Sequence, residues 1–297
     1  WISYSTSIVV CVRLAYGTIN GQVTFAGGTA VEGVKVTAEA ATGASGKSGV
    51  FNGTNSYAKA NNDPLLQSNE LTVSAFIKPA VLTGFQVIAS KHDHLGNGWT
   101  LYLADNILRL HLGLNHYNAI NHTAIVPNNW FSVGAIVSSN SIKLFVNGDT
   151  TLFIDTLNNL SAMNTATDLY VGKQLNGLHF NGKIDEVRVF NNALTQTEFE
   201  RLHDVYINPS YNGLVAYWRF DEGFGSTGFD YSKTNQTLNA NNLSLTNVSF
   251  LNDFPTTTQL TAGAYTNDLG SYYIPFIPFL GNGDNFLLRP ELGSHNF

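Results

Sequence analysis

Cysteine, methionine and charged residues are scarce in this chain. Its 297 residues include one Cys and one Met, and 12% of them are charged, which is about half the usual share for a soluble globular domain. The cysteine, Cys11, lies in the apolar run Ile8–Val12, where it reads as a small buried hydrophobic residue. A disulfide framework is therefore excluded, and stability must come from core burial, with metal binding as a further source.

The net charge and the hydrophobic runs exclude two further classes of partner. A net charge of −6 argues against nucleic acid and anionic membrane surfaces. The most apolar runs, Ile8–Val12 and Tyr272–Leu280, are too short or too interrupted by proline to cross a bilayer. Because the chain starts at Trp1 and carries no signal peptide, we expect a piece of a longer extracellular protein, secreted or held at the cell surface.

Surface polarity must come from Asn, Thr, Ser and Gly, which favour strands and turns over helices. Short alternating runs follow one another with turn signals at regular spacing, and this pattern predicts an all-β sandwich. The expected strands are Leu71–Ile77, Gln86–Ser90, Trp99–Leu103, Leu108–Leu112, Trp130–Val137 and Ile142–Val146. The sequence Asn147-Gly148 after the last of these predicts a tight hairpin turn.

Residues 182–199, which read G-K-I-D-E-V-R-V-F-N-N-A-L-T-Q-T-E-F, predict a strand that runs into a short helix. Thr195 and Glu198 have the spacing of a capping box, in which hydroxyl and carboxylate satisfy the first free amides of a helix. Phe199 and Leu202 then give that helix an apolar stripe. We expect one short helix near residues 195–204, capping one end of a sheet.

This segment resembles the closing signature of laminin-G-like (concanavalin-A-like, type 3) jelly-roll domains, G-x-I-D-E-V-R-I-Y-N-x-A-L-S-x-x-E-I. The resemblance implies a jelly roll of two sheets that serves adhesion or recognition rather than catalysis. It also implies calcium, which is common in related domains.

A second resemblance comes from the two ends of the chain. Residues 17–40 read as two short alternating strands around a Gly-Gly turn. They resemble the opening of carboxypeptidase-regulatory-like or Cna-B-like Ig-type domains, whose usual continuation appears only at Thr266–Ile274. We therefore predict a jelly roll (49–257) inserted into a discontinuous Ig-like sandwich (17–48 plus 258–297), preceded by a strand or linker of another module (1–16).

The strand order within the jelly roll also differs from the expected one. Leu214–Gly225 reads L-V-A-Y-W-R-F-D-E-G-F-G and resembles the first block of laminin-G-like domains, yet it follows the helix. Val50–Tyr57 resembles the second block and opens the domain instead. We interpret this as circular permutation; the alternative is that Leu214 begins a second, truncated jelly roll.

Catalytic motifs are missing from the sequence. A retaining glycosidase needs two carboxylates about 5–5.5 Å apart, whereas Asp185 and Glu186 are adjacent and should point to opposite faces of a strand. His92 and His94 lie in a loop sequence, and no further residues complete a zinc set. No G-x-S-x-G elbow is present. We predict that the chain is not an enzyme.

Calcium is the more plausible ion, because carboxylate oxygens suit a hard cation. The candidate ligands are Asp185, Asp221, Glu222 and Asp230. The alternative is that Asp221 and Asp230 cap turns while Asp185 pairs with Arg188 or with backbone amides. Both interpretations remain open at this point.

Sugar binding uses aromatic faces and polar donors in loops at a sheet edge. The candidate glycan contacts are Asp93, His94, Asn97, Trp99, Tyr117 and His179. Core packing is the expected fate of Trp130 and Tyr102.

Two functions follow. The first is a non-catalytic structural or adhesive module of a large extracellular repeat protein, a cell-surface adhesin or filament resembling the giant surface proteins of Bacteroidota. The second is a carbohydrate-binding module that targets a polysaccharide for an enzyme elsewhere in the parent chain. The expected partners are a glycan or a surface protein, together with neighbouring modules of the same chain or filament.

Overall fold

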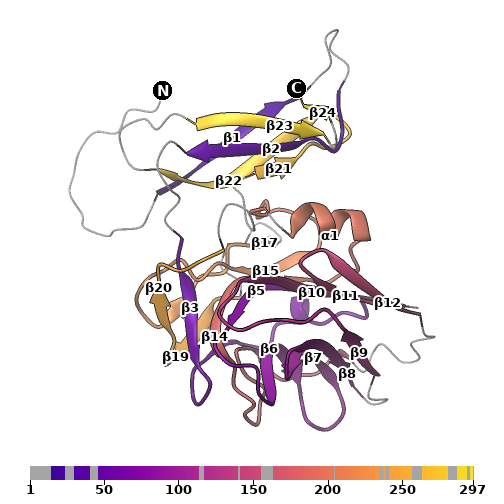
Figure 1. The fold of residues 1–297 in the computed structure, drawn as a ribbon, viewed down its shortest axis with the longest axis vertical. Helices are drawn as coiled ribbons and strands as arrows, with labels where there is room; N and C mark the ends of the chain where they lie inside the picture. The colour runs from indigo at the N-terminus through magenta and orange to yellow at the C-terminus, as the bar shows by residue number, and fades with distance from the viewer. Residues whose placement is uncertain are drawn as a thin grey trace.

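The computed structural model describes residues 15–23, 30–40, 46–113, 117–139, 141–154, 163–203, 205–234, 237–238, 241–255, 263–279, 286–292 and 295–296. The described residues form an all-β molecule with one α-helix (Figure 1). Cys11 and most of the strand expected in residues 1–16 lie outside the described residues. No helix in the described ranges has the length and apolar character needed to cross a bilayer.

Two sheets of eight strands each form a sandwich, as predicted. The first, called the β14 sheet here, has the order β12-β11-β10-β5-β14-β3-β20, with β15 beside β14. Its strands are β3 (Ser48–Asn52), β5 (Leu71–Pro79), β10 (Phe131–Ser138), β11 (Ser141–Val146), β12 (Asp149–Ile154), β14 (Asn181–Phe190), β15 (Leu214–Trp218) and β20 (Ser249–Leu251).

The second sheet, called the β7 sheet, has the order β16-β19-β4-β13-β6-β7-β8-β9. Its strands are β4 (Tyr57–Ala60), β6 (Phe85–His92), β7 (Gly98–Ala104), β8 (Ile107–Leu112), β9 (Tyr117–Asn121), β13 (Leu169–Val171), β16 (Thr227–Gly228) and β19 (Leu243–Thr246). A 3-10 turn, η1 (Pro64–Leu66), and a small hairpin of β17 (Lys233–Thr234) and β18 (Thr237–Leu238) complete the connections.

The hydrophobic core lies between the two sheets and follows from the period of two along each strand. In β8, Leu108, Leu110 and Leu112 are buried, whereas Arg109 and His111 between them point to the outer face. Burying one such leucine contributes roughly 1.5–3 kcal/mol. The same alternation in β7 and β4 gives the β7 sheet an apolar inner face and a polar outer face.

The helix α1 (Gln196–Leu202) covers the outer face of the β14 sheet. The predicted capping box is confirmed: Thr195 Oγ1 accepts from the Glu198 amide, and Glu198 Oε2 accepts from the Thr195 amide. Phe199 is buried and stacks on Phe145 of β11, with ring centroids 4.0 Å apart. Gly134 of β10 permits this approach, because a Cβ there would meet Phe199 Cζ at 2.6 Å.

Arg188 of β14 holds the end of that helix. Its Nη1 donates to the Leu202 carbonyl at 2.7 Å, and its Nη2 donates to the Val205 carbonyl at 2.9 Å. The last carbonyls of a helix have no partner within the helix. A guanidinium from the underlying strand supplies one here and ties α1 to the sheet.

Strand β15 lies in the same sheet as β3 and β14. It pairs with residues Val187–Phe190 of β14, while β3 pairs with Asn181–Ile184 along the same edge. Trp218 at the end of β15 is completely buried. The structure therefore does not place the 214–220 block in a second jelly roll, and circular permutation stays a prediction.

Strands from the two ends of the chain pair with each other above α1 (Figure 1). One small sheet joins β1 (Ala15–Gln22) to β22 (Ser271–Phe279), and the other has the order β21-β2-β23-β24. The strands of the second small sheet are β2 (Lys35–Ala40), β21 (Gly263–Tyr265), β23 (Phe286–Leu292) and β24 (His295–Asn296). The domain boundaries and the Ig-like assignment stay predictions.

The two small sheets share a core and contact the helix. Val34, Val36 and Ile274 are buried together. Arg201 of α1 reaches toward these strands: its Nη1 lies 3.3 Å from Glu32 Oε1, and its guanidinium lies 5.9 Å from the Tyr265 ring centroid. These contacts connect α1 to the small sandwich.

Candidate functional site

Outward side chains of five strands form one row across the β7 sheet. From β4 to β8, the directly paired positions are Lys59, Tyr170, Ser90, Thr100 and His111. Each is next to a core residue of its own strand, so strand alternation turns it to the outer face. Tyr170, Ser90 and Thr100 are nevertheless buried, with exposed fractions of 9%, 1% and 3%. The row combines a cation, a phenol, two hydroxyls and an imidazole.

A tyrosine–lysine cluster, made of Tyr57, Tyr170 and Lys173, lies on the β4 side of this row. Lys173 Nζ lies 3.8 Å from the Tyr57 ring centroid and 4.8 Å from that of Tyr170. The two rings are 6.0 Å apart at an interplanar angle of 62°. Aromatic faces attract cations electrostatically, so the two rings hold the ammonium group in place. Burial raises the pKa of Tyr170, which keeps its phenol neutral.

A hairpin of residues 172–180 crosses the outer face. The Val87 amide donates to the Leu178 carbonyl at 3.2 Å, and the Asn176 amide donates to His94 Nε2 at 3.2 Å. The hairpin therefore runs along β6, from near its start to just beyond its end. His179 leaves the hairpin beside Tyr57, at a ring distance of 6.5 Å, with Nδ1 3.1 Å from the Ser56 carbonyl.

The loop between β6 and β7 is organised by Asp93. Its Oδ1 accepts from the Leu95 and Asn97 amides at 2.8 and 2.9 Å, and its Oδ2 accepts from Asn97 Nδ2 at 2.7 Å. Burial alone would raise the pKa of Asp93, but these hydrogen bonds outweigh burial and lower that pKa below its usual value. Gly98 closes the loop at φ 103°, where a Cβ would lie 1.9 Å from the Lys91 carbonyl oxygen.

A histidine cluster, made of His92, His94 and His111, lies beside this loop. The His92 ring is 5.3 Å from that of His94 and 5.2 Å from that of His111. His92 Nδ1 accepts from the His94 amide at 3.0 Å. Next to the cluster, Tyr102 pairs across the strands with Arg109, and its ring lies 5.9 Å from that of Phe85, which is 56% exposed.

The structure thus brings three of the predicted glycan contacts together in one loop. Asp93, His94 and Asn97 lie in the β6–β7 loop, and His179 lies in the hairpin that contacts this loop. Sequence reasoning missed Tyr57, Tyr170, Lys173 and His111. The signal was available in part, since Tyr57, Tyr170 and His111 occupy the alternate positions between core residues of β4, β13 and β8.

Comparison with known proteins agrees with this architecture. Residues 52–199 match the family model described as the concanavalin A-like lectin/glucanases superfamily. That segment runs from the end of β3 into α1 and contains most of both sheets. The sandwich has the concanavalin-A-like fold.

Solved structures are similar to this chain to different degrees. A candidate carbohydrate-binding protein from Bacteroides ovatus is 18% identical with a TM-score of 0.55, over 74% of this chain and 61% of its own. This chain thus spans less than two thirds of that protein. Domain 4 of the extracellular GH43 arabinanase AbnA from Geobacillus stearothermophilus, in complex with arabinotriose, is 24% identical with a TM-score of 0.45, over 57% of this chain and 82% of its own.

The Ruminococcus gnavus IT-sialidase CBM40 bound to α2,3-sialyllactose is 16% identical with a TM-score of 0.45, over 54% of this chain and 99% of its own. At 18% identity, the likeness to the Bacteroides ovatus protein establishes the fold alone. No curated protein matches the chain.

Two of the expected glycan contacts, Trp99 and Tyr117, are not among the surface side chains that the structure describes. Trp99 is 2% exposed and belongs to the core between the sheets, so it is not a surface contact. Leu101 and Leu103 lie two and four residues further along β7, so Trp99 shares their inward face. Tyr117 lies in β9, and its side chain is outside the described residues.

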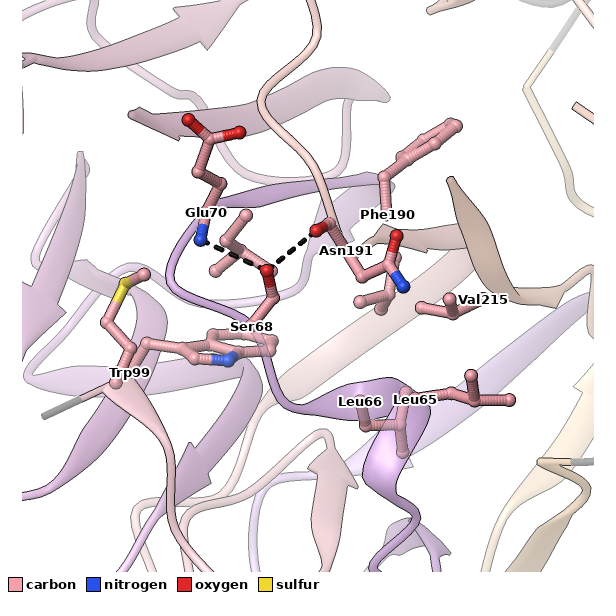
Figure 2. Close-up of a pocket in the computed structure, with 11 residues that line it drawn as sticks. Leu65, Leu66, Ser68, Glu70, Trp99, Phe190, Asn191 and Val215 are labelled. Carbon is pink, nitrogen blue, oxygen red and sulfur yellow. Dashed lines mark hydrogen bonds between the residues drawn. The ribbon is translucent and has the colours of Figure 1, made fainter. Parts of the chain in front are cut away.

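Trp99 also lines a small interior cavity (Figure 2). Ser68 also lines this cavity, and its Oγ donates to the Asn191 carbonyl at 2.7 Å and accepts from the Glu70 amide at 3.1 Å. The cavity volume is about 10 Å³, which is at or below the volume that one water molecule needs. The cavity is therefore too small for a sugar or a cofactor.

Asp230 is one of the four expected calcium ligands, and its carboxylate accepts hydrogen bonds from groups within the concanavalin-A-like domain. Oδ1 accepts from the Tyr217 and Ser232 amides at 3.0 and 2.9 Å. Oδ2 accepts from Ser232 Oγ and from the Asn241 amide, both at 3.0 Å. Asp230 is completely buried. Its geometry is that of a turn-capping residue.

Asp185 and Asp221 lie beside a buried arginine. Arg219 Nη2 donates to Asp221 Oδ2 at 2.7 Å, and the Lys47 amide donates to Asp221 Oδ1 at 2.8 Å. Burial, followed by the charges of Glu186 and Asp221, raises the pKa of Asp185 well above its usual range. Asp185 Oδ1 accepts from the Glu186 amide at 2.8 Å, so this oxygen already has a partner within the chain.

A bulge in β14 changes the expected relation between Asp185 and Glu186. The register shifts between Asp185 and Arg188, and Glu186 adopts φ 50°. Glu186 accepts from Arg188 Nη2 at 3.0 Å and from Arg219 Nε at 3.2 Å, and it also accepts from the Tyr217 hydroxyl. Both carboxyl groups are buried next to the same arginine, rather than simply facing opposite sides of a regular strand.

The four acids therefore do not fit a shared calcium site. Glu222 Oε1 accepts from the Phe229 amide at 2.7 Å, so it too has a partner within the chain. In the described ranges, no three His, Cys, Asp or Glu side chains are arranged to hold a metal ion. Calcium binding by the chain stays a prediction, and the function proposed below does not require calcium.

Proposed function

We propose that this chain is a non-catalytic carbohydrate-binding module whose ligand lies on the outer face of the β7 sheet. The observation that carries the proposal is the tyrosine–lysine cluster, in which Tyr57 and Lys173 are partly exposed and Lys59 lies beside them on the same face. Ser90 and Thr100, in the middle of the row, are buried and hydrogen-bonded to each other. Sugar rings present apolar C–H faces and hydroxyl groups, so they match aromatic surfaces flanked by a few fixed polar groups.

The loops at the edge of this face support the proposal. Asp93 fixes the β6–β7 loop, and His94 joins that loop to the 172–180 hairpin. Leu95 and Leu178, which are 83% and 48% exposed, lie on these two segments. A ligand on the face therefore meets a pre-organised edge, which reduces the entropy cost of binding.

The charges of the face favour binding over catalysis. The carboxylates that the structure describes on this face are Asp93 and Asp168. Asp93 accepts three hydrogen bonds from its own loop, and Asp168 pairs with Lys59 at 3.0 Å. Glycoside hydrolysis needs one carboxyl group as acid and another as base or nucleophile, and this pair is already committed to structural contacts.

The test is a panel of polysaccharides in affinity electrophoresis, followed by calorimetry on each retained polymer. Tyr57→Ala and Tyr102→Ala change one aromatic on each side of the hairpin, and Tyr273→Ala on β22 of the small sandwich is the matched control. We expect at least about tenfold weaker binding in one of the two site variants, because central aromatics dominate such interfaces. The control should bind like the wild type.

Equal binding by all three variants would overturn the placement of the site on this face. Retention of no polysaccharide would overturn the carbohydrate proposal itself. The structural and adhesive role in a large surface protein would then be the remaining function. Release of reducing sugar from any retained polymer would contradict the non-catalytic part of the proposal.

A further inference from the structure

The charge of the β7 outer face differs from that of the whole chain. The chain has a net charge of −6. The strands and hairpin of this face carry the cations Lys59, Arg109 and Lys173, against Asp168, the loop residue Asp93 and, in the β7–β8 turn, Asp105. The face is therefore near neutral on an acidic protein, and a cation on it that has no ion pair attracts anions.

Lys173 is the cation of this face whose charge is available to a ligand. Lys59 is 3.0 Å from Asp168 Oδ2, and Arg109 contacts the Tyr102 phenol. Lys173 makes no ion pair with any described residue; its described neighbours are the faces of Tyr57 and Tyr170. An aromatic face offers no formal negative charge, so the ammonium group keeps its full positive charge for an incoming anion.

The cluster around Lys173 is already ordered. Two rings at 3.8 and 4.8 Å restrict the lysine side chain, so less conformational entropy is lost when it binds a ligand. His179 lies next to Tyr57, and its Nδ1 faces the Ser56 carbonyl, which can only accept a hydrogen bond. Nδ1 therefore carries the proton, and Nε2 remains as the second ring nitrogen for contact with a sugar hydroxyl.

We propose that the ligand of this face is an acidic saccharide whose anionic group binds Lys173 Nζ. The inference rests on the proposed function and narrows its ligand class. The sugar ring lies against the edges of the tyrosine–lysine cluster, and its hydroxyls contact the partly exposed polar groups beside the cluster, His179 and Lys59. The shared chemistry is a carboxylate or sulfate on a sugar, and the experiment separates these two sources.

The experiment uses matched polymers within the polysaccharide panel. Polygalacturonate is compared with its methyl ester, and the sulfated galactan carrageenan with neutral agarose. We expect the wild type to bind at least one acidic polymer about tenfold more tightly than its neutral counterpart, since hydrogen bonds to charged groups are the stronger ones. Which acidic polymer is preferred identifies the anionic group, and 1 M NaCl should weaken that binding by screening.

Lys173→Gln tests the residue itself. This change removes the charge and keeps a polar side chain, and Lys143→Gln on β11 of the opposite sheet is the matched control. We expect Lys173→Gln to reduce acidic-polymer binding about tenfold or more and to leave the thermal midpoint near that of the wild type. The Lys143→Gln control should keep wild-type affinity.

The outcomes distinguish this inference from the proposed function. Equal binding of acidic and neutral polymers, or binding of neutral polymers alone, would overturn the inference and leave the carbohydrate proposal intact. Full acidic-polymer affinity in folded Lys173→Gln would also overturn it. Retention of no polymer at all would overturn the carbohydrate proposal first.

Discussion

Replacement of Asp230 by alanine should destabilise the concanavalin-A-like domain strongly and without any involvement of calcium. The Asp230 carboxylate accepts from the amides of Tyr217, Ser232 and Asn241 and from the Ser232 hydroxyl. These groups connect the end of β15 to the segments that follow it. Alanine removes every one of these acceptor positions at once.

The expected loss follows from the donors left behind. A buried donor without an acceptor costs about 1–3 kcal/mol, and Asp230 is completely buried. Water that enters the space left by the carboxylate will satisfy some of the donors, so we expect a total loss of about 3–5 kcal/mol rather than the full sum. For a domain of this size that corresponds to a decrease in thermal midpoint of about 10 °C.

Urea unfolding followed by tryptophan fluorescence is a suitable assay. Trp218 Nε1 donates to the Asn241 carbonyl at 2.8 Å, so its emission reports on this region. Asp268→Ala, which changes an exposed aspartate, is the control and should alter stability little. Each protein is measured with and without EDTA.

The outcome with EDTA decides between the two roles of Asp230. We expect the same stability with and without chelator in the wild type, and the same loss in Asp230→Ala under both conditions. A wild type that melts lower in EDTA, together with an Asp230→Ala variant that has lost this sensitivity, would refute the turn-capping account and restore the calcium prediction. A loss below about 1 kcal/mol would show that the four donors find other acceptors.

Three further changes test other parts of the structure. Trp218→Ala should cost about 3–5 kcal/mol by urea unfolding, because it deletes a fully buried aromatic; a loss under about 1 kcal/mol would make β15 peripheral. Burial raises the pKa of Glu222 from 4.5 to about 7. The folded state therefore holds this proton more tightly than the unfolded chain, so the free energy of unfolding should fall as the pH rises from about 4.5 to about 7. Glu222→Gln should remove that part of the slope between pH 4 and pH 8, and an unchanged slope would assign it to other groups. Gly98→Ala should disorder the β6–β7 loop and weaken glycan binding, since its Cβ would lie 1.9 Å from the Lys91 carbonyl oxygen; calorimetry with a retained polysaccharide checks this, and wild-type affinity would show that the loop is not part of the site.

Much of the sandwich could be predicted because local patterns agree with the global fold. The expected strand Leu108–Leu112 is β8 within one residue at its start, and its alternating leucines are the core residues. Thr195 and Glu198 form the capping box that their spacing predicted. Both signals depend on neighbours within a few residues, which the sequence displays directly.

The candidate site was harder to predict because its parts are distant in sequence. Tyr57 and Lys173 meet only because β4 and β13 are neighbours in the sheet. Trp99 was expected at the surface, although its spacing of two and four residues from Leu101 and Leu103 places it on the core face of β7. That error came from weighing the residue type above the strand pattern.

The buried acids were unpredictable for a different reason. The bulge in β14 gives Glu186 a φ of 50°. Its signal in the sequence is the break in alternation between Ile184 and Val187, which does not show where the acids between them point. The bulge brings Glu186 to Arg188 and Arg219. A regular strand was the only basis for the expected directions of these side chains, and the extra residue removed that basis.

The clamp of Arg188 on α1 has a mechanical consequence. Arg188 donates from β14 to the carbonyls of Leu202 and Val205 at the end of the helix, so α1 cannot move away from the sheet without breaking hydrogen bonds to this strand. Strand β14 lies between β5 and β3 and is hydrogen-bonded along both edges. A displacement of α1 is therefore resisted by an interior strand that has a partner on each side, rather than by an edge strand that has one.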